Sequence, residues 1–361
     1  MRVVLSGGGT GGHIYPGLAV AQALRKETSP ELLYIGVRGR MDETIVGAAG
    51  LPLETVRAAP LRVGSPLAML RNGVSLAAGV IESWRILGRF RPDAVFATGG
   101  YASVPVGVAA RLRRLPLLVY LPDVNPGWAV RLLSRVATRI AATSERSLAA
   151  LPKDKALATG YPVREEFWTT SKAGARAKLG LPQDEPVLLV TGASQGARRL
   201  NDAVAGQLDG LLALCHVVHL TGRADEQKAI GRREALPEAQ RARYHVHGYL
   251  DAIADAMAAA DLAVMRSGAS VLGELPAAGL PAVLVPGVYE GGYDQRANAR
   301  YLAEQGAAVV RENEELSKLT DVVRELLSDS ERLRSMSAAA RRLARPDAAR
   351  TIAKMLTEMA A

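Results

Sequence analysis

The stretch that decides the fold lies at residues 2–24, which read RVVLSGGGTGGHIYPGLAVAQAL. A short apolar run (3–5) leads into a glycine-rich turn (7–12), and a stretch with helical spacing (18–24) follows. A strand that turns through glycines into a helix presents backbone N–H groups at the positive end of the helix dipole. Glycines also let a phosphate or a sugar approach the backbone closely. The segment therefore predicts an anion-binding turn, with His13 placed to handle protons where the helix starts.

The same turn has two other interpretations. Gly7, Gly9 and Gly12 fit the dinucleotide-binding pattern G-x-G-x-x-G. That pattern expects an acidic residue at the end of the second strand, but the strand predicted at 31–35 continues into GVRGR (36–40), which has no carboxylate. An NAD-dependent enzyme is therefore disfavoured. The other alternative is a turn that only packs the strand against the helix.

Length and composition indicate two domains in a reducing compartment. The chain has 361 residues, of which 48% are hydrophobic, so two sizeable cores are available. Its single cysteine, Cys215, excludes an internal disulfide and is interpreted as a small buried hydrophobe. We expect no secretory leader and no transmembrane helix, because the longest uncharged stretch considered (94–110) contains two adjacent glycines and a proline.

The net charge of +9 is distributed unevenly along the chain. Nine arginines lie between positions 57 and 114, against only Glu82 and Asp93, and apolar residues are interleaved with them. This pattern favours contact with an anionic membrane surface. A nucleic-acid partner is disfavoured, because aromatic residues make up 4% of the chain and no nucleic-acid motif is present. The alternative is a solvated helix whose apolar side faces the core.

Strand-like and helical stretches alternate along the whole chain, which predicts two doubly wound α/β domains with parallel sheets. Turn residues at 160–164 separate them. We predict an N-terminal domain at 1–162, a C-terminal domain at 163–340, and a final helix at 341–361 that crosses back to the first domain. The predicted strands are 2–6, 32–36, 94–98, 117–120 and 139–142, then 187–191, 216–221, 244–247, 262–265 and 282–285.

Two further glycine turns follow predicted strands. TGGYASVP (98–105) places more amides at the carboxyl edge of the first sheet, where ligands of open α/β sheets bind, or it is only a small-residue helix entry. In GASQGAR (192–198), the Ser194 hydroxyl and the following amides suit a pyrophosphate, to which Arg164 can add a charge-assisted contact. The segment lacks the G-K-[ST] ending of a P-loop, so an NTPase is disfavoured.

A last turn, RSGASVLGE (266–274), opens another predicted helix. We interpret Ser267 as its N-cap and place Glu274 about two turns into it, where a carboxylate can accept both hydroxyls of a ribose. The alternative is an ordinary surface glutamate. Downstream, Gln295 and Asn298 can bond to sugar hydroxyls. Histidines lack partners at ligand spacing, so we predict neither a metal nor a cofactor.

Taken together, these motifs resemble the MurG family of bacterial cell-wall glycosyltransferases over nearly the whole chain. The motifs that carry the resemblance, in the family's order, are GGTGGHIYPGLAVA (8–21), TGGYASVP (98–105), GYPVR (160–164), GASQGARRLN (192–201), RSGAS…GE…AAGLPAVLVP (266–286) and DQRANA (294–299).

The resemblance implies the GT-B fold, with two Rossmann-like domains separated by a cleft. It implies an inverting hexosyltransferase that moves GlcNAc from UDP-GlcNAc to the C4 hydroxyl of MurNAc in undecaprenyl-linked lipid I, giving lipid II for peptidoglycan, and hence for cell shape and division. It also implies a peripheral protein at the cytoplasmic face of the cell membrane. The alternatives are a GT-B enzyme with another lipid acceptor, a UDP-GlcNAc 2-epimerase and a non-catalytic nucleotide-sugar-binding module.

The resemblance also assigns site residues. His13 matches the histidine proposed as catalytic, acting as base or as an orienting group. One departure is Asp123, which stands where the family has an asparagine, and the loop 289–293 is also unusual. The matching donor contacts are Thr10, Gly11, Gly12, Arg164, Ser194, Leu250, Ala269, Ser270, Val271, Glu274 and Gln295.

Overall fold

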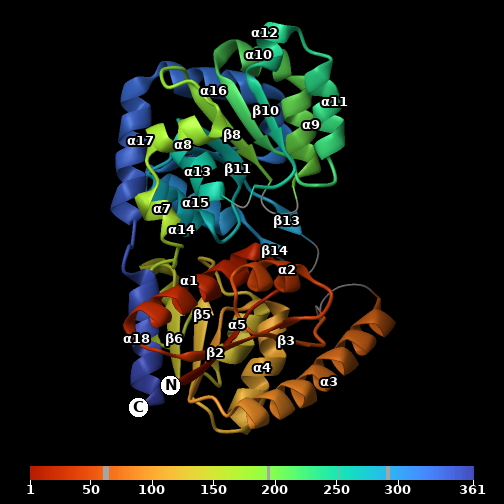
Figure 1. The fold of residues 1–361 in the computed structure, drawn as a ribbon, viewed down its shortest axis with the longest axis vertical. Coiled ribbons are helices and arrows are strands. Elements are labelled where there is room, and N and C mark those ends of the chain that lie inside the picture. Colours follow the sequence, from red (N-terminus) through yellow and green to blue (C-terminus); the bar gives the residue numbers. More distant parts are fainter. Residues whose placement is uncertain (60–64, 193–195, 251, 290–292) are drawn as a thin grey trace. The chain divides into compact units, whose positions relative to one another are not determined.

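The computed structural model describes residues 1–59, 65–192, 196–250, 252–289 and 293–361. The described chain divides into two compact units, each with its own parallel sheet (Figure 1). Unit 1 comprises Met1–Arg164, Tyr289–Tyr293 and Arg345–Ala361, and unit 2 comprises Glu165–Val288 and Asp294–Ala344.

The sheet of unit 1 has seven strands in the order β3-β2-β1-β4-β5-β6-β7, and all its pairs are parallel. Two strands, β2 and β3, lie on one side of β1 and four on the other, as expected when helical crossovers run over both faces. The strands are β1 (Arg2–Ser6), β2 (Glu31–Val37), β3 (Leu53–Val56), β4 (Ala94–Ala97), β5 (Leu117–Leu121), β6 (Arg139–Ala142) and β7 (Ala156–Ala158).

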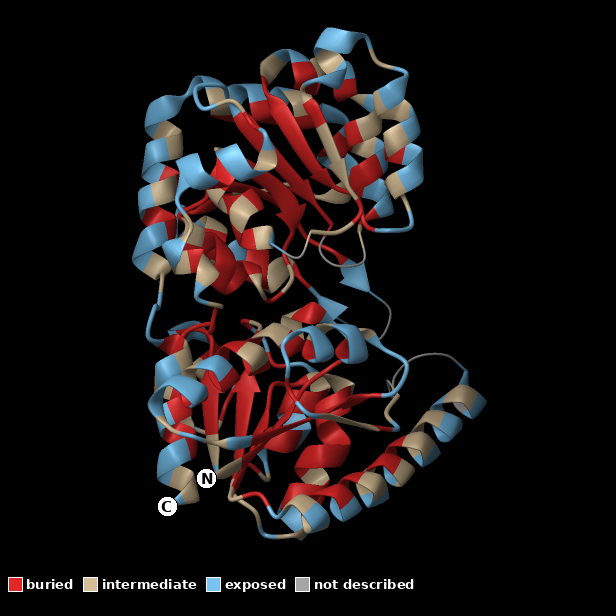
Figure 2. Ribbon diagram, viewed as in Figure 1, coloured by how far each residue is buried: buried red, intermediate tan, exposed pale blue. Residues whose placement is uncertain are grey.

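Helices cover this sheet, and the C-terminal helix packs against the first one. The central strands are buried, while the outward sides of the helices are exposed (Figure 2). The core is rich in Val, Ile and Leu, as a sheet buried on both faces requires. The helices of unit 1 are α1 (Gly11–Glu27), α2 (Met41–Ala48), α3 (Pro66–Phe90), α4 (Gly100–Leu112), α5 (Trp128–Ser134), α6 (Glu145–Leu148) and α18 (Ala348–Ala360).

The sheet of unit 2 has six parallel strands in the order β10-β9-β8-β11-β12-β15. A separate core lies beneath it, and Cys215 is fully buried there, as predicted. The strands are β8 (Val187–Thr191), β9 (His216–Leu220), β10 (Tyr244–His247), β11 (Leu262–Arg266), β12 (Ala282–Val285) and β15 (Ala308–Val310), with a small pair β13 (Val288–Tyr289) and β14 (Tyr293–Asp294) outside it.

The helices of unit 2 alternate with these strands. They are α7 (Glu166–Thr169), α8 (Lys172–Leu179), α9 (Arg198–Gly206), α10 (Leu208–Leu214), α11 (Glu226–Glu234), α12 (Glu238–Arg241), α13 (Ile253–Ala259), α14 (Val271–Ala278), α15 (Arg296–Glu304), the 3-10 helix η1 (Asn313–Lys318), α16 (Leu319–Ser328) and α17 (Ser330–Leu343).

Every predicted strand is present, with ends that differ by at most one residue. Sequence reasoning missed the short strands β3, β7 and β15, which lie at the edges of their sheets, and the β13–β14 pair. Among the described residues, no helix is long and apolar enough to cross a membrane.

Candidate functional site

Two glycine turns lie together at the carboxyl edge of the sheet of unit 1, because β1 and β4 are neighbouring parallel strands. The first turn follows β1 and opens α1 at Gly11, with exposed Thr10 at the N-cap position. The second follows β4, where Gly99 and Gly100 both adopt positive φ, +89° and +73°. A side chain at either glycine would approach the His13 ring to 3.4 Å or less, so the ring rests on this second turn.

The hydrogen bonds of His13 define its tautomer. Nδ1 lies 3.0 Å from the carbonyl oxygen of Thr98, which can only accept a hydrogen bond, so we assign the proton to Nδ1. In the neutral imidazole, Nε2 then carries the free lone pair. The Thr98 hydroxyl donates in return to the carbonyl oxygen of His13 at 2.5 Å. His13 is therefore held in an orientation and a tautomer that suit a general base.

Two residues of the GYPVR motif, the predicted site residue Arg164 and its neighbour Tyr161, lie beside this turn in unit 1. The Tyr161 hydroxyl donates to the carbonyl oxygen of Gly12 at 3.2 Å. The guanidinium of half-buried Arg164 lies over the ring of Tyr15, 4.4 Å from its centroid. This cation–π contact places Arg164 next to α1, within the same unit as His13.

Sequence reasoning missed Asp42. No carboxylate is present at 36–40, as noted, but the side chain of Asp42, in the first turn of α2, contacts the glycine turn after β1. Its Oδ2 accepts from the Gly9 amide at 3.1 Å, and its side chain is fully buried. Burial raises the pKa of this carboxyl, although the amide hydrogen bonds oppose the shift. The signal available in the sequence was an acidic residue that follows the second strand at a short distance.

A second site forms at the carboxyl edge of the sheet of unit 2, where β8, β11 and β12 end side by side. The turn after β11 leads into α14, so the positive end of the dipole of this helix faces this edge. The amides of Val271, Leu272 and Gly273 already donate to carbonyls of the preceding turn, at 268–270. Ser194, in the turn after β8, lies outside the described residues. Leu250 is half-buried in the loop after β10.

Two details of α14 differ from the prediction. The N-cap position is occupied by Ser270, not Ser267, because the turn from Gly268 is tight and the helix begins only at Val271. Glu274 consequently lies in the first turn rather than two turns in, and it is 7% exposed. Ala269 and Val271 are buried beside it, and Ser270 is half-buried. A carboxylate in the first turn still lies at the positive end of the helix dipole.

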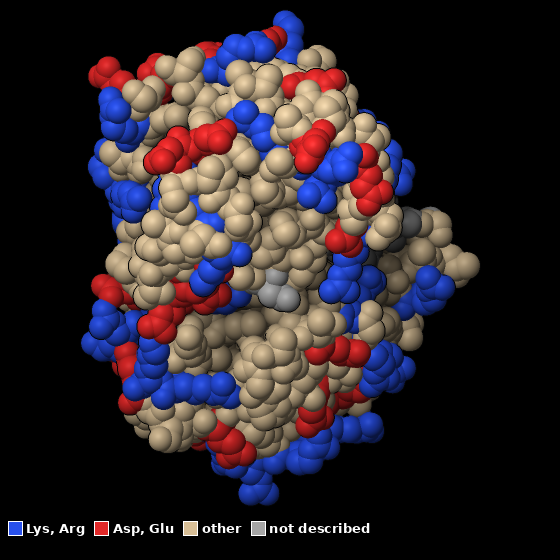
Figure 3. Space-filling view, turned by 45° about the horizontal axis from the view of Figure 1, so that its top comes forward, with Lys and Arg blue, Asp and Glu red and all other residues tan. Residues whose placement is uncertain are grey.

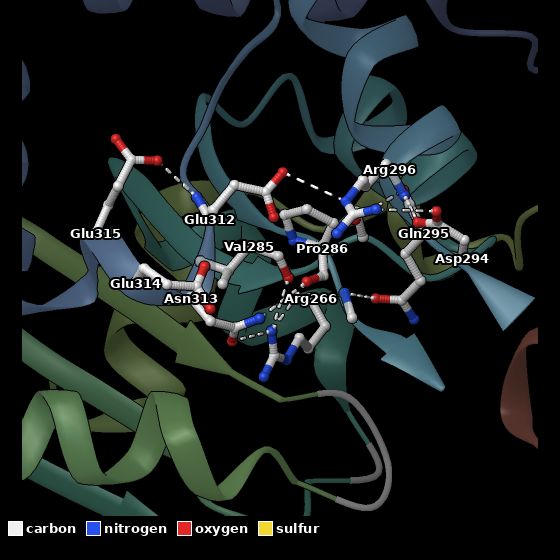
Figure 4. Close-up of polar contacts among 12 residues, drawn as sticks. Arg266, Val285, Pro286, Asp294, Gln295, Arg296, Glu312, Asn313, Glu314 and Glu315 are labelled. Atoms are coloured by element: carbon white, nitrogen blue, oxygen red, sulfur yellow. Dashed lines mark hydrogen bonds and ion pairs between the residues drawn. The ribbon is translucent and has the colours of Figure 1, made fainter. Parts of the chain in front are cut away.

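Gln295 closes the base of the loop after β12. Its side-chain Oε1 accepts a hydrogen bond from the Gly287 backbone amide at 2.9 Å (Figure 4). The backbone amide of Gln295 donates to the Gly287 carbonyl at 3.0 Å. Ser267 instead donates its hydroxyl to the carbonyl of Gln295 at 3.1 Å, and the Asn298 amide donates to the carbonyl of Ser267 at 3.1 Å. Part of the hydrogen-bonding capacity that we assigned to sugar hydroxyls is therefore used to shape the loop.

Arg266 joins the ends of two strands to η1. Its Nη1 donates to the carbonyls of Val285 and Pro286 and, at 2.9 Å, to Oδ1 of Asn313 (Figure 4). The side chain is 8% exposed, so this edge of the sheet carries a buried positive charge. Among the described residues, no group of three His, Cys, Asp or Glu side chains is arranged to hold a metal ion.

Helix α3 has an apolar face on each side. Leu76, Ile86 and Leu87 are buried. The opposite face exposes apolar side chains at helical spacing, an outer stripe consisting of Leu67, Leu70, Val74, Ile81 and Trp84, with exposed fractions of 47–77%.

The basic charge around this stripe is partly neutralised. Arg89 pairs with Glu54 at 2.5 Å and Arg57 with Glu82 at 2.8 Å, while Arg113 lies 4.0 Å from the ring centroid of Trp84. On the face drawn in Figure 3, basic and acidic side chains are interspersed with uncharged ones. Both Arg71 and Arg85 are exposed on α3, and Arg62 lies outside the described residues.

Comparison with protein families gives two matches that together span most of the chain. The N-terminal domain of glycosyltransferase family 28 matches residues 3–142, and its C-terminal domain matches residues 187–352. Two relatives bear the name UDP-N-acetylglucosamine–N-acetylmuramyl-(pentapeptide) pyrophosphoryl-undecaprenol N-acetylglucosamine transferase. The one from Roseiflexus sp. (strain RS-1) is 40% identical over 99% of this chain and 94% of its own. The one from Moorella thermoacetica is 39% identical over 99% of this chain and 98% of its own.

Solved structures share the fold. Acinetobacter baumannii MurG matches with a TM-score of 0.75 at 24% identity, covering 99% of both chains. UDP-GlcNAc 2-epimerase from Neisseria meningitidis, bound to UDP-GlcNAc, matches with a TM-score of 0.69 at 15% identity, covering 99% of this chain and 100% of its own. The two parallel-sheet units and these likenesses confirm the predicted GT-B fold class.

Proposed function

Since the chain belongs to glycosyltransferase family 28, we propose that it transfers N-acetylglucosamine from UDP-GlcNAc to undecaprenyl-linked lipid I, giving lipid II. The observation that carries this proposal is the full-length likeness to relatives named for this transfer. It agrees with the family predicted from the motifs. The epimerase alternative shares only the fold at 15% identity, so fold alone does not support it.

His13 is the proposed general base. Its Nε2 takes the proton of the C4 hydroxyl of MurNAc as that oxygen attacks the anomeric carbon of GlcNAc. The bond from the anomeric carbon to the β-phosphate oxygen breaks, UDP leaves with the electron pair, and the configuration inverts from α to β. The Nδ1 contact with Thr98 supports this role, because it leaves Nε2 as the basic atom.

Unit 2 is the proposed donor site. The segment at the N-terminus of α14, residues 269–271, binds the pyrophosphate, together with Ser194. Glu274 accepts the ribose hydroxyls, the Leu250 backbone reads the uracil, and Gln295 lies near the sugar. Fixed dipoles and a cationic side chain stabilise the negative charge that develops on UDP without having to reorganise during the reaction. The family resemblance implies further donor contacts at Thr10, Gly11, Gly12 and Arg164, which belong to unit 1.

The outer stripe of α3 is the proposed contact with an anionic membrane surface. Its apolar side chains are exposed in a line along one side of the helix, and Arg71 and Arg85 lie on the same helix. An amphipathic helix of this kind lies in the plane of the interface, with its apolar face among the acyl chains. The lipid-linked acceptor lies in such a surface, so the enzyme rests where its substrate is.

The test is UDP release from UDP-GlcNAc, measured with and without a lipid I analogue. We expect release only when the analogue is present, together with a product that contains both sugars. Conversion of the donor without acceptor would instead identify an epimerase. Binding of UDP-GlcNAc with no turnover under either condition would identify a binding module. Activity with diacylglycerol in place of the analogue would reveal another lipid acceptor.

A further inference from the structure

We infer that Asp42 is a positioning residue that fixes the glycine turn carrying His13. The inference rests on the proposed function, in which His13 acts as the base. Asp42 does not contact the substrate in this assignment. It fixes the backbone of the turn, and the backbone in turn fixes the position of the His13 imidazole.

The position of Asp42 is dictated by close packing with two glycines. A Cβ atom on Gly8 would lie 2.0 Å from Asp42 Oδ1, and one on Gly36 would lie 2.8 Å from the Asp42 side chain. Both glycines therefore leave space into which the Asp42 side chain packs. The result is a charged side chain with no exposed surface between the end of β2 and the turn after β1.

Each carboxylate oxygen accepts one backbone hydrogen bond. Oδ2 accepts from the Gly9 amide at 3.1 Å, and Oδ1 accepts from the Val37 amide at 3.3 Å. A carboxylate has only acceptors, so it satisfies both amides. An asparagine in the same place can satisfy one, and its own NH₂ group would then face the other N–H. The site is therefore built for an ionised acid rather than for any side chain of this size.

Other contacts hold the rest of the turn. The hydroxyl of fully buried Tyr34 donates to the carbonyl of Gly7 at 2.6 Å, and Thr98 donates to the carbonyl of His13. Gly9 lies between these two anchors, and the Asp42 bond is the side-chain contact that fixes its amide. Releasing Gly9 would free the middle of the turn while both ends stay attached. We therefore expect a misplaced His13 rather than an unfolded unit.

A nucleotide-binding role for Asp42 conflicts with this geometry. A carboxylate that holds a ribose projects into the ligand site at the end of the second strand. Asp42 instead has both oxygens engaged by backbone amides and no exposed surface. Its contacts are internal, which distinguishes a positioning residue from a substrate-binding one.

The experiment compares Asp42→Asn with Glu43→Gln as the matched control. Glu43 is the next residue of α2, is exposed, and also accepts a backbone amide, that of Gly39 at 2.9 Å. In Asp42→Asn we expect kcat with the lipid I analogue to fall at least about tenfold, with KM for UDP-GlcNAc and the affinity for UDP changed less than about twofold. The amide of Gly9 should exchange with deuterium at least about tenfold faster. In Glu43→Gln all of these quantities should keep their wild-type values.

A second pair of variants tests the packing between Asp42 and Gly8 by changing Gly8. Gly8→Ala should lower kcat because its methyl group displaces the carboxylate. In an Asp42→Ala background that methyl group loses its clash with the carboxylate and keeps only a tight contact with the Cβ of Ala102 at 3.2 Å, so Gly8→Ala should cost much less. Additive losses, or unchanged Gly9 exchange in Asp42→Asn, would overturn the inference. An inactive wild-type enzyme would overturn the proposed function instead, while Gly9 exchange would still decide the role of Asp42.

Discussion

At the scale of single residues, His13 gives the sharpest prediction. In His13→Ala the base is lost while the donor site in unit 2 is untouched, so we expect kcat to fall by about 10²–10⁴. Affinity for UDP should stay within about twofold of wild type. Steady-state UDP release and calorimetric titration with UDP measure the two quantities. A variant that turns over at the wild-type rate would exclude His13 from the mechanism.

His219 predicts how stability depends on pH. It is buried between the Tyr244 hydroxyl, 2.8 Å from Nδ1, and Oδ1 of Asn201, 3.1 Å from Nε2. Burial lowers the pKa of His219 to about 4, from 6.5. Between these two pH values the histidine is protonated in the unfolded chain but stays neutral in the folded chain. The free energy of unfolding therefore decreases as pH falls from 6.5 towards 4.

The measurement is the free energy of unfolding of wild type and His219→Gln at pH 7 and at pH 4. Glutamine does not titrate, so the difference between the two proteins should change by about 3 kcal/mol between these pH values. Between pH 7 and pH 4, the free energy of unfolding should fall more in wild type than in His219→Gln. His216, His245 and His247 also have lowered pKa values and affect both proteins alike. A difference that is independent of pH would contradict the assignment.

How far residues could be predicted from sequence depended on whether their partners were near in sequence. His13 could be placed at the helix start because the turn and the helix are contiguous. Asp42 was missed because its partner, Gly9, lies 33 positions away and the contact depends on how β1 and β2 pair. Ser267 was assigned as a cap from its residue type, whereas its hydroxyl bonds to Gln295, 28 positions on.

At the scale of elements, α14 predicts how the ribose is recognised. If Glu274 accepts the ribose hydroxyls, wild type should bind UDP about tenfold more tightly than 2′-deoxy-UDP, as expected for a hydrogen bond to a charged group. In Glu274→Gln this preference should shrink to about twofold or less, while Glu234→Gln on exposed α11 keeps it. Calorimetric titration with the two nucleotides measures it. Equal preference in all three proteins would remove Glu274 from the ribose site.

The outer stripe of α3 predicts binding to vesicles. We expect Leu70→Glu, Val74→Glu and Ile81→Glu together to weaken binding to anionic vesicles at least tenfold, because burying each apolar side chain contributes about 1–3 kcal/mol. The control is Leu157→Glu, which changes an exposed leucine on edge strand β7. Co-sedimentation measures binding, and unaltered binding of the triple variant would reject this surface.

Charge reversal on the same helix compares Arg71 and Arg85, which form no ion pair within the described part of the chain, with Arg89, which pairs with Glu54. Arg89 is neutralised by Glu54, so Arg71→Glu and Arg85→Glu should weaken vesicle binding more than Arg89→Glu does. Each lost cation near an anionic surface is worth about 1 kcal/mol. The difference should vanish at high salt. Equal effects of the three substitutions at low salt would contradict this distinction.

Elements were predictable where their pattern was strong. Buried parallel strands such as β5 and β8 are continuous apolar runs, and the helix starts are marked by glycine turns. The edge strands β3, β7 and β15 are only three or four residues long and partly exposed, so their composition is that of loops. Pairing with a neighbouring strand, rather than local pattern, makes them strands.

At the scale of the whole molecule, the sequence indicated two domains because two sets of alternating elements are present. The return of a final helix (341–361) to the first domain was predicted, but the sequence could not specify which residues of that helix enter the core, since that depends on packing far along the chain. Residues 345–361 belong to unit 1, although they follow the helices of unit 2. In α18, Ile352 and Leu356 are fully buried against the first unit, where α18 contacts α1.

This arrangement predicts that α18 stabilises unit 1 without contributing to donor binding. Ile352→Ala with Leu356→Ala should lower the free energy of unfolding by about 4 kcal/mol or more, because each leaves a cavity in a packed core. Glu358→Ala is the control on the same helix, and it removes only an exposed pair with Arg139. UDP at about 100 times its Kd should stabilise all of these proteins equally, by about 2.7 kcal/mol, since none of the proposed donor contacts belongs to α18. Calorimetric scans with and without UDP measure both effects, and loss of the UDP increment in the double variant would show that α18 takes part in donor binding.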